Sequence, residues 1–433
     1  MYRRAGLAMA VLAMTVGGVA HAQASKDKKS SVKLPVAQAW IDVATYSGMG
    51  MPSMAGGGSP MAMLDGLFGG GGSRNTFGNT MTGTAGRWVD VTLFTRNNPN
   101  LEEASQTVPE GSKLAPSLRL VSPKIQKSPP SQDDEVVRED FEPPKGKIYL
   151  YWGCGDTARP GQPRVLDMSK AGMEDFQKFF VGRRATQRGA HLATGRPAWP
   201  NEQDARMVPD GASLVGEHAF KGQGVPDGFR FNLGAPQDLM MPIELRQRDM
   251  GGATALEWKG IPTARAYFIS AMGARGGKET EMVFWSSSEL PDTGTGLVDY
   301  QTNPAVDRWL KEKVLLAPEA RNCSVPKGVF TGEGAMLRMI AYGSELNLVH
   351  PPRPADPKAA WEPQWATKVR VKSVANAMLG MDMADMMKKS SSESSGRDYS
   401  SLSSDRSRRD KAESGGMDGI GQGLNKLKGL FGF

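Results

Sequence analysis

Apolar and polar residues alternate with a period of two in several short stretches of the chain, which is typical of β-strands with one buried face. The clearest such stretch is 88–95. Strands are also predicted at 36–46, which is rich in β-branched and aromatic residues, and at 147–152 and 266–271. Helical periodicity is best developed after Asn303, where Pro304 follows at the first turn and the pattern runs to about 315. The chain is therefore predicted to be mainly β, with a few short helices.

A further strand is predicted at 365–372. In it, Lys368, Arg370 and Lys372 alternate with two valines. This pattern predicts one buried face and one basic, solvated face.

Another pattern lies between 253 and 290. The strand Leu256-Glu257-Trp258 is followed by a break at Pro262 and by Ala264-Arg265-Ala266-Tyr267. This L-x-W strand, turn and A-x-x-Y strand resembles a fibronectin type III-like or related immunoglobulin-like module over about 250–350. The resemblance implies a β-sandwich fold and no particular function.

The domain organisation follows from the distribution of tryptophan, glycine and proline. An N-terminal β region is predicted at 34–250 and a fibronectin-III-like β region at 251–372, which makes two sandwich-like regions. The first region contains a Gly/Met-rich insertion at 47–86, interpreted as flexible, and a Pro-rich acidic linker at 122–145.

The N-terminus has the features of a signal peptide. Two arginines precede an apolar run of signal-peptide length and an Ala-His-Ala cleavage site within residues 1–24, and a basic leader follows at 25–33. The apolar run is shorter than the roughly 20 residues of a membrane span. We therefore expect an exported protein, periplasmic or secreted if bacterial, with no transmembrane helix in the mature chain.

Two distinct segments are predicted after the last strand. Residues 373–412 form a Ser-rich linker that we expect to be disordered. Residues 413–433 form a short basic amphipathic segment, and its predicted membrane or partner contacts are Leu424, Leu427, Leu430 and Phe431.

Composition excludes several classes of protein. The net charge of +7 falls to +5 when the two arginines of the signal peptide are removed, which is too mild to indicate nucleic-acid binding. Two cysteines cannot build a four-cysteine zinc site. In an exported protein they are expected to pair, so a disulfide between Cys154 and Cys323 is predicted, with two buried thiols as the alternative.

Methionines gather in two short segments, and ten of the 25 in the chain lie there. Thioether clusters can bind Cu(I), because soft ligands select soft ions. Their alternative role is that of adaptable apolar residues in a partner-binding segment. The candidate ligands are Met49, Met51, Met54, Met61, Met63, Met378, Met381 and Met383.

A basic stretch between 182 and 206 contains the candidate residues for an anionic ligand, a glycan or a lipid headgroup. A solvated loop is the other interpretation. The candidates are Arg183, Arg184, Arg188, Arg196 and Trp199, with His191 interleaved.

No established catalytic motif is present, so no catalytic residue and no cofactor is predicted. The preferred function is a non-enzymatic binding or scaffolding protein of the cell envelope, with an envelope protein, a glycan or a membrane surface as partner. The alternatives are a Cu(I)-handling protein and a hydrolase whose site is assembled from distant residues. A cleft with Asp or Glu beside His191, His218 or His350 would favour the hydrolase.

Overall fold

A computed structural model of the protein describes residues 33–48, 75–82, 84–114, 116–124, 146–180, 182–186, 188–275, 278–331, 335–356 and 358–380. The predicted signal peptide, nearly all of the basic leader, most of the Gly/Met-rich insertion, most of the Pro-rich linker and the predicted C-terminal amphipathic segment lie outside these residues. Strands dominate what is described, which confirms the prediction of a mainly β protein.

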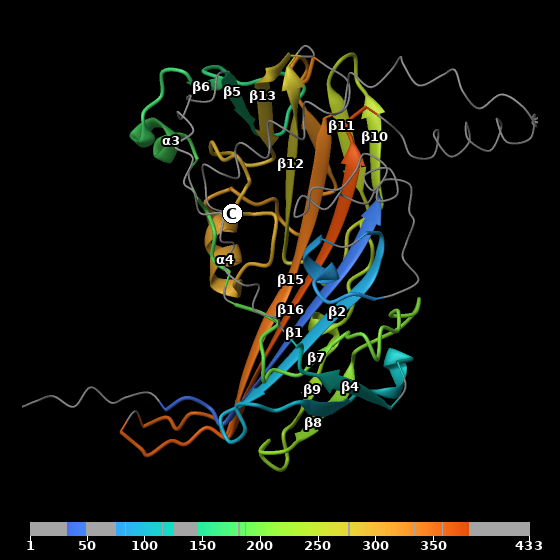
Figure 1. Ribbon diagram of the computed structural model, residues 1–433. Coiled ribbons are helices and arrows are strands. Elements are labelled where there is room, and N and C mark those ends of the chain that lie inside the picture. The colour runs from blue at the N-terminus through green and yellow to red at the C-terminus, as the bar shows by residue number, and fades with distance from the viewer. Residues whose placement is uncertain are drawn as a thin grey trace, which may run out of the picture.

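Thirteen strands form one large sheet, in the order β6-β5-β13-β12-β15-β16-β1-β2-β7-β4-β3-β8-β9, and three more form a small sheet, β10-β11-β14. Figure 1 shows β15, β16, β1 and β2 as long strands that run side by side through the molecule. The large sheet consists of β1 (Ala37–Gly48), β2 (Gly86–Thr95), β3 (Glu103–Thr107), β4 (Ser117–Val121), β5 (Lys147–Trp152), β6 (Arg164–Asp167), β7 (Ala198–Trp199), β8 (Gly216–Gly222), β9 (Arg230–Leu233), β12 (Ala266–Arg275), β13 (Lys278–Ser286), β15 (Met336–His350) and β16 (Trp365–Met378). The small sheet consists of β10 (Leu245–Asp249), β11 (Thr254–Trp258) and β14 (Asn322–Val325).

The first and last of these strands are neighbours at the centre of the large sheet. β1 pairs in parallel with β16, from Ala37 opposite Trp365 to Gly48 opposite Asn376, and pairs antiparallel with β2 on its other side. The two predicted regions are therefore joined in one continuous sheet. Pairing between such distant strands leaves no local signal, since each strand shows only the alternation of its own residues.

The two faces of the long strands are covered differently. Val43 of β1 belongs to an apolar cluster that includes Leu256 of β11, so the small sheet covers this face. The next residue, Ala44, packs in a second cluster with Trp309 of α4 (Asn303–Lys311). Figure 1 shows α4 and the β10–β11 pair on opposite sides of the long strands. The other helical elements are α2 (Asn79–Thr82), α3 (Met173–Phe179) and two 3-10 turns, η1 (Glu110–Ser112) and η2 (Ala235–Gln237).

Helix α4 begins at Asn303, one residue before the predicted first position Pro304, and ends about one turn earlier than predicted. The helix stops at Lys311, and Lys313 has a left-handed backbone conformation with φ 58°. The amide of Val314 then donates to the carbonyl of Trp309, which directs the following apolar residues back into the core.

The strand β16 corrects the predicted start of the Ser-rich linker. Residues 373–378 continue the strand rather than beginning a linker. Ser373 and Asn376 are buried, and the Ser373 hydroxyl donates to the carbonyl of Met241 at 2.9 Å. A small polar residue is tolerated here because its hydrogen-bonding group finds a partner within the protein.

The end of the Gly/Met-rich insertion is also structured. Residues 75–82 contain α2, and Thr80 is fully buried against the sheet. These residues therefore belong to the folded part of the protein and not to a flexible insertion that reaches residue 86.

The predicted disulfide is confirmed. Cys154, which follows β5, is bonded to Cys323 in β14, and their Cα atoms are 5.1 Å apart. The amide of Gly155 donates to the carbonyl of Ser324 beside it. The bond therefore ties one end of the large sheet to the small sheet.

The residues behind the fibronectin-like resemblance pack against each other from two sheets. Trp258 lies in β11 of the small sheet and Tyr267 in β12 of the large sheet, with their ring centroids 5.6 Å apart. The Tyr267 hydroxyl accepts a hydrogen bond from the amide of Ile261 in the intervening turn. Membership of that module class stays a prediction.

Candidate functional site

A buried ion pair connects the two central strands. Asp42 of β1 and Arg370 of β16 lie opposite each other, and the Arg370 Nε atom donates to Asp42 Oδ1 at 2.7 Å. Both residues are almost completely buried. Burial disfavours the charge of Arg370, but the hydrogen bond and charge of Asp42 outweigh it and hold the Arg370 pKa above its ordinary value.

A second buried pair lies one step along the strand. Lys372 is fully buried, and its Nζ atom donates to Asp299 Oδ1 at 2.8 Å. Burial opposes ionisation of Asp299, but the Lys372 ammonium more than compensates and the Asp299 pKa is lowered. The Tyr300 ring contacts both cations, with its centroid 4.1 Å from Lys372 Nζ and 4.3 Å from Arg370 Cζ.

These contacts correct the predicted basic, solvated face of the last strand. Arg370 and Lys372 are buried and paired, and Lys368 is partly buried. Carboxylates from β1 and from the segment before α4 supply the compensating charge, and neither is visible in the sequence of β16 itself.

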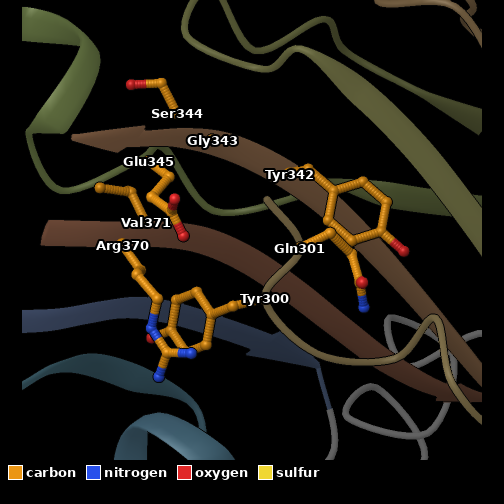
Figure 2. A pocket seen from close by; sticks show the side chains of 8 residues that line it. All are labelled: Tyr300, Gln301, Tyr342, Gly343, Ser344, Glu345, Arg370 and Val371. Atoms are coloured by element: carbon orange, nitrogen blue, oxygen red, sulfur yellow. The ribbon is translucent and has the colours of Figure 1, made fainter. Parts of the chain in front are cut away.

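The hollow beside this network is tightly packed. Figure 2 shows Arg370 and Tyr300 close together, with Tyr342 and Gln301 nearby and Glu345 on the neighbouring strand. The side chains leave no room for a water-sized molecule inside it. We therefore assign the ion-pair network a structural role rather than a ligand-binding one.

The network fixes a loop over the sheet. The Arg370 Nη1 atom donates to the Thr186 hydroxyl at 3.0 Å, and the Ala190 amide donates to Asp42 Oδ2 at 3.1 Å. Gly189 allows this close approach, since a Cβ atom at that position would lie 1.9 Å from Arg370 Nη2. The loop continues into a turn in which the Arg196 amide donates to the carbonyl of Ala193.

The turn places Arg196 against aromatic rings. Its Cζ atom is 4.6 Å from the centroid of the Trp40 ring and 5.2 Å from that of Phe94. The His191 ring meets Trp40 edge-on, with centroids 5.5 Å apart. We call Trp40, Phe94, Arg188, His191 and Arg196 the Arg196 cluster.

Hydrogen bonds define the tautomer of His191. The Nδ1 atom lies 2.7 Å from the carbonyl oxygen of Gly189, so it carries the proton and donates. The Arg196 Nη1 atom packs against the same ring, 2.6 Å from Nε2 and 3.4 Å from Nδ1. Burial and the charges of Arg196 and Arg188 lower the His191 pKa, which favours the neutral ring.

Among the residues described, Arg196 has no carboxylate partner. None of the ion pairs among the residues described includes Arg196, and its Nε atom is buried without a hydrogen-bond partner. Burial and the charge of Arg188 lower the Arg196 pKa. Lys368 lies opposite Trp40 on the next strand, where burial lowers its pKa and the charges of Glu345 and Asp42 act against this. An anion would be attracted to Arg196.

The other predicted anion contacts lie elsewhere. Arg183 pairs with the buried Asp292, and Arg184 is exposed. Trp199 is fully buried in the core, where it does not face solvent. The aromatic partner of Arg196 is instead Trp40, which sequence inspection missed because it precedes the basic segment by more than 140 residues.

The remaining histidines have structural contacts. His218 is buried, with its Nδ1 atom 3.0 Å from the Gln106 amide nitrogen and its Nε2 atom 2.8 Å from the carbonyl of Leu214. His350 stacks on Trp365. These contacts give no support to the hydrolase alternative.

The buried carboxyl of Asp90 lies opposite Asp42 on β2. It accepts hydrogen bonds from the Gly78 amide at 3.1 Å and from the Thr80 hydroxyl, and so anchors residues 75–82. Desolvation is the largest effect on this group and raises its pKa to about 7.

Of the predicted methionine ligands, Met378 ends β16 and the other seven lie outside the residues described, as do the predicted C-terminal contacts. No group of His, Cys, Asp and Glu in the described part of the chain could hold a metal ion. Within the same residues, no helix is long and apolar enough to cross a membrane.

Comparison with known proteins does not assign a family. No protein-family model matches the chain, and no curated protein shows significant similarity to it.

Proposed function

We propose that this protein is an exported, non-enzymatic binding protein of the cell envelope that holds an acidic envelope glycan through the Arg196 cluster. The observation that carries the proposal is the half-buried guanidinium of Arg196, which has no carboxylate partner among the residues described. A cation held in this way is stabilised when an external anion approaches.

An acidic glycan can present such an anion to the cluster. Trp40 is only 8% exposed and packs against Arg196, so a ligand meets the guanidinium rather than the indole ring. A carboxylate or sulfate that projects from a sugar can make this contact. The fixed loop provides a preorganised site, which reduces the ordering cost of binding.

The test is calorimetric titration of the mature protein with dextran sulfate, with neutral dextran as the uncharged control. We expect binding of dextran sulfate alone, weakened by salt, and at least about tenfold weaker in Arg196→Gln, the loss typical of a charged contact. Arg353→Gln is the matched control, because Arg353 also faces a tryptophan ring, that of Trp361.

Two results would overturn the proposal. One is equal binding of dextran sulfate by the wild type and Arg196→Gln. The other is binding only to vesicles that contain anionic phospholipid, which would identify a membrane surface as the partner. The export component is tested by cell fractionation and by N-terminal sequencing of the mature chain, and a retained N-terminus in the cytosol would contradict it.

A second candidate, Cu(I) handling, is favoured by one observation. Gly48 at the end of β1 lies opposite Asn376 near the end of β16, so both methionine segments start from neighbouring strand ends. Titration of the reduced ion into the full mature chain tests this candidate. Absence of binding tighter than micromolar would remove it.

A further inference from the structure

Further polar side chains lie next to the Arg196 cluster, on the same face of the large sheet. We propose that the glycan is a polymer with an acidic group on successive sugar units, and that it lies as an extended chain across β1, β16 and β15. Lys368 then binds a second acidic group, and Asn347 binds a sugar hydroxyl further along the chain. This inference rests on the proposed function and makes its ligand a polysaccharide chain rather than a single acidic sugar.

The strand register places these residues in one row. Trp40 of β1 lies opposite Lys368 of β16, and Lys368 lies opposite Asn347 of β15. Residues directly opposite each other point to the same face of a sheet, and neighbouring strands are about 4.8 Å apart. Because the Arg196 guanidinium packs against the Trp40 ring, Lys368 and Asn347 follow it in steps of about 4.8 Å. Each step is close to the length of one sugar unit in an extended chain.

Solvent reaches this part of the sheet face. Asn347 is exposed and Lys368 is half-buried. Helix α4 begins beside Glu345, whose carbonyl accepts a hydrogen bond from Asn303 Nδ2 at 2.7 Å, so the row of Asn347 lies just past the start of the helix. Figure 1 shows the long strands continuing past α4 toward the connection between β15 and β16. A chain that crosses the strands here can therefore meet the polar side chains of the row.

The charges around the row favour a ligand with several acidic groups. Arg370 in the adjoining row lies between two acids, Asp42 and Glu345, and both of these acids also act on Lys368. Arg370 offsets one of the two, so Lys368 and the two arginines of the Arg196 cluster leave positive charge in excess. Cations one strand spacing apart attract a chain with repeated charges more strongly than they attract a single acidic group.

Asn347 provides an uncharged contact at the end of the row. Its Nδ2 atom donates to Glu345 Oε1 at 2.7 Å, which orients the side-chain amide and leaves its oxygen as an acceptor. A sugar hydroxyl can donate to this oxygen, whereas a carboxylate has no proton to donate. The row therefore offers an acid-binding position at Lys368 and a hydroxyl-binding position at Asn347.

The experiment measures affinity against chain length. Galacturonate, its oligomers of about two to six units, and size-fractionated oligosaccharides of dextran sulfate are titrated into the mature protein by calorimetry. The fully methyl-esterified galacturonate trimer is the uncharged control. We expect affinity to rise by at least about tenfold from one unit to three and then to level off, because the added contacts form within one complex and end with the row.

Two variants test the row itself. Lys368→Gln should lose most of the gain with chain length, since the second charged contact is removed. Asn347→Ala, at an exposed position, should lose a smaller part, about two- to tenfold, as is typical of an uncharged hydrogen bond. Lys311→Gln, exposed on α4, is the matched control and should keep the gain of the wild type. Near-UV circular dichroism confirms that each variant is folded.

The outcomes separate the two proposals. Equal affinity for one unit and three units in both series would overturn the extended chain while leaving the proposed function intact. So would a gain with chain length that survives unchanged in Asn347→Ala and in folded Lys368→Gln. Absence of all binding by the wild type, to the dextran sulfate polymer as well, would remove both proposals.

Discussion

Replacing Asp90 with asparagine should make the stability of the protein less dependent on pH. Asp90 is 2% exposed, and its pKa is raised from 3.8 to about 7, chiefly by desolvation. Asparagine has nearly the same shape and keeps one oxygen to accept the bonds from Gly78 and Thr80. The substitution therefore removes the titration and changes little else.

The direction in which stability changes with pH follows from proton linkage. Between about pH 4 and 7 the folded protein holds a proton on Asp90 that the unfolded chain has released, so stability falls as the pH rises through this range. A difference of about 3 pKa units corresponds to at most about 4 kcal/mol. The free energy of unfolding of Asp90→Asn should therefore rise relative to that of the wild type, by up to about 4 kcal/mol as the pH goes from about 4 to 8.

The assay is urea unfolding of both proteins without reductant, at half-unit steps across this range. The free energy of unfolding of the wild type is subtracted from that of the variant at each pH. Asp227→Asn, at an exposed position, is the control and should give a flat difference. A flat difference for Asp90→Asn as well would refute the claim that desolvation governs this carboxyl.

Three further changes test other parts of the structure. Replacing both cysteines with alanine should lower the unfolding free energy by about 5 kcal/mol in the chain-entropy description of a bond that spans 169 residues, and an unchanged urea midpoint would contradict it. Lys372→Met leaves Asp299 without its partner and should cost about 3–5 kcal/mol, measured by the same unfolding assay, while adding Asp299→Asn should recover part of the loss. Gly189→Ala brings a methyl group against Arg370 and should displace the loop. Dextran sulfate binding should then fall while the far-UV circular dichroism spectrum stays the same. Unchanged binding would argue against the fixed loop.

Part of the fold could be predicted from the sequence because it depends on local pattern. Alternation and β-branched or aromatic content located most long strands, Asn303 and Pro304 marked the start of α4, and the cysteines of an expected exported protein indicated the disulfide. The parallel pairing of β1 with β16 could not be predicted, since neither strand records which neighbour it will meet.

The candidate site was predictable only in part for the same reason. The basic segment pointed to Arg188, His191 and Arg196, but the aromatic ring beneath them comes from β1. Trp199 was the nearer tryptophan in the sequence, and β7 turns it into the core instead. Lysine and arginine alternating with valine are typical of a solvated face, and only the folded arrangement reveals the buried carboxylates that pair with them.

The position of β1 between β2 and β16 has a kinetic consequence. During synthesis, β1 is made more than 300 residues before the strand that completes its hydrogen bonding. Until β16 is present, the inner edges of β1 and β15 expose unpaired amides and carbonyls, which are templates for association with other chains. The centre of the sheet therefore cannot fold until nearly all of the described chain has been made. The high contact order predicts slow folding. A chain that ends before residue 365 is expected to aggregate rather than to form a smaller folded domain.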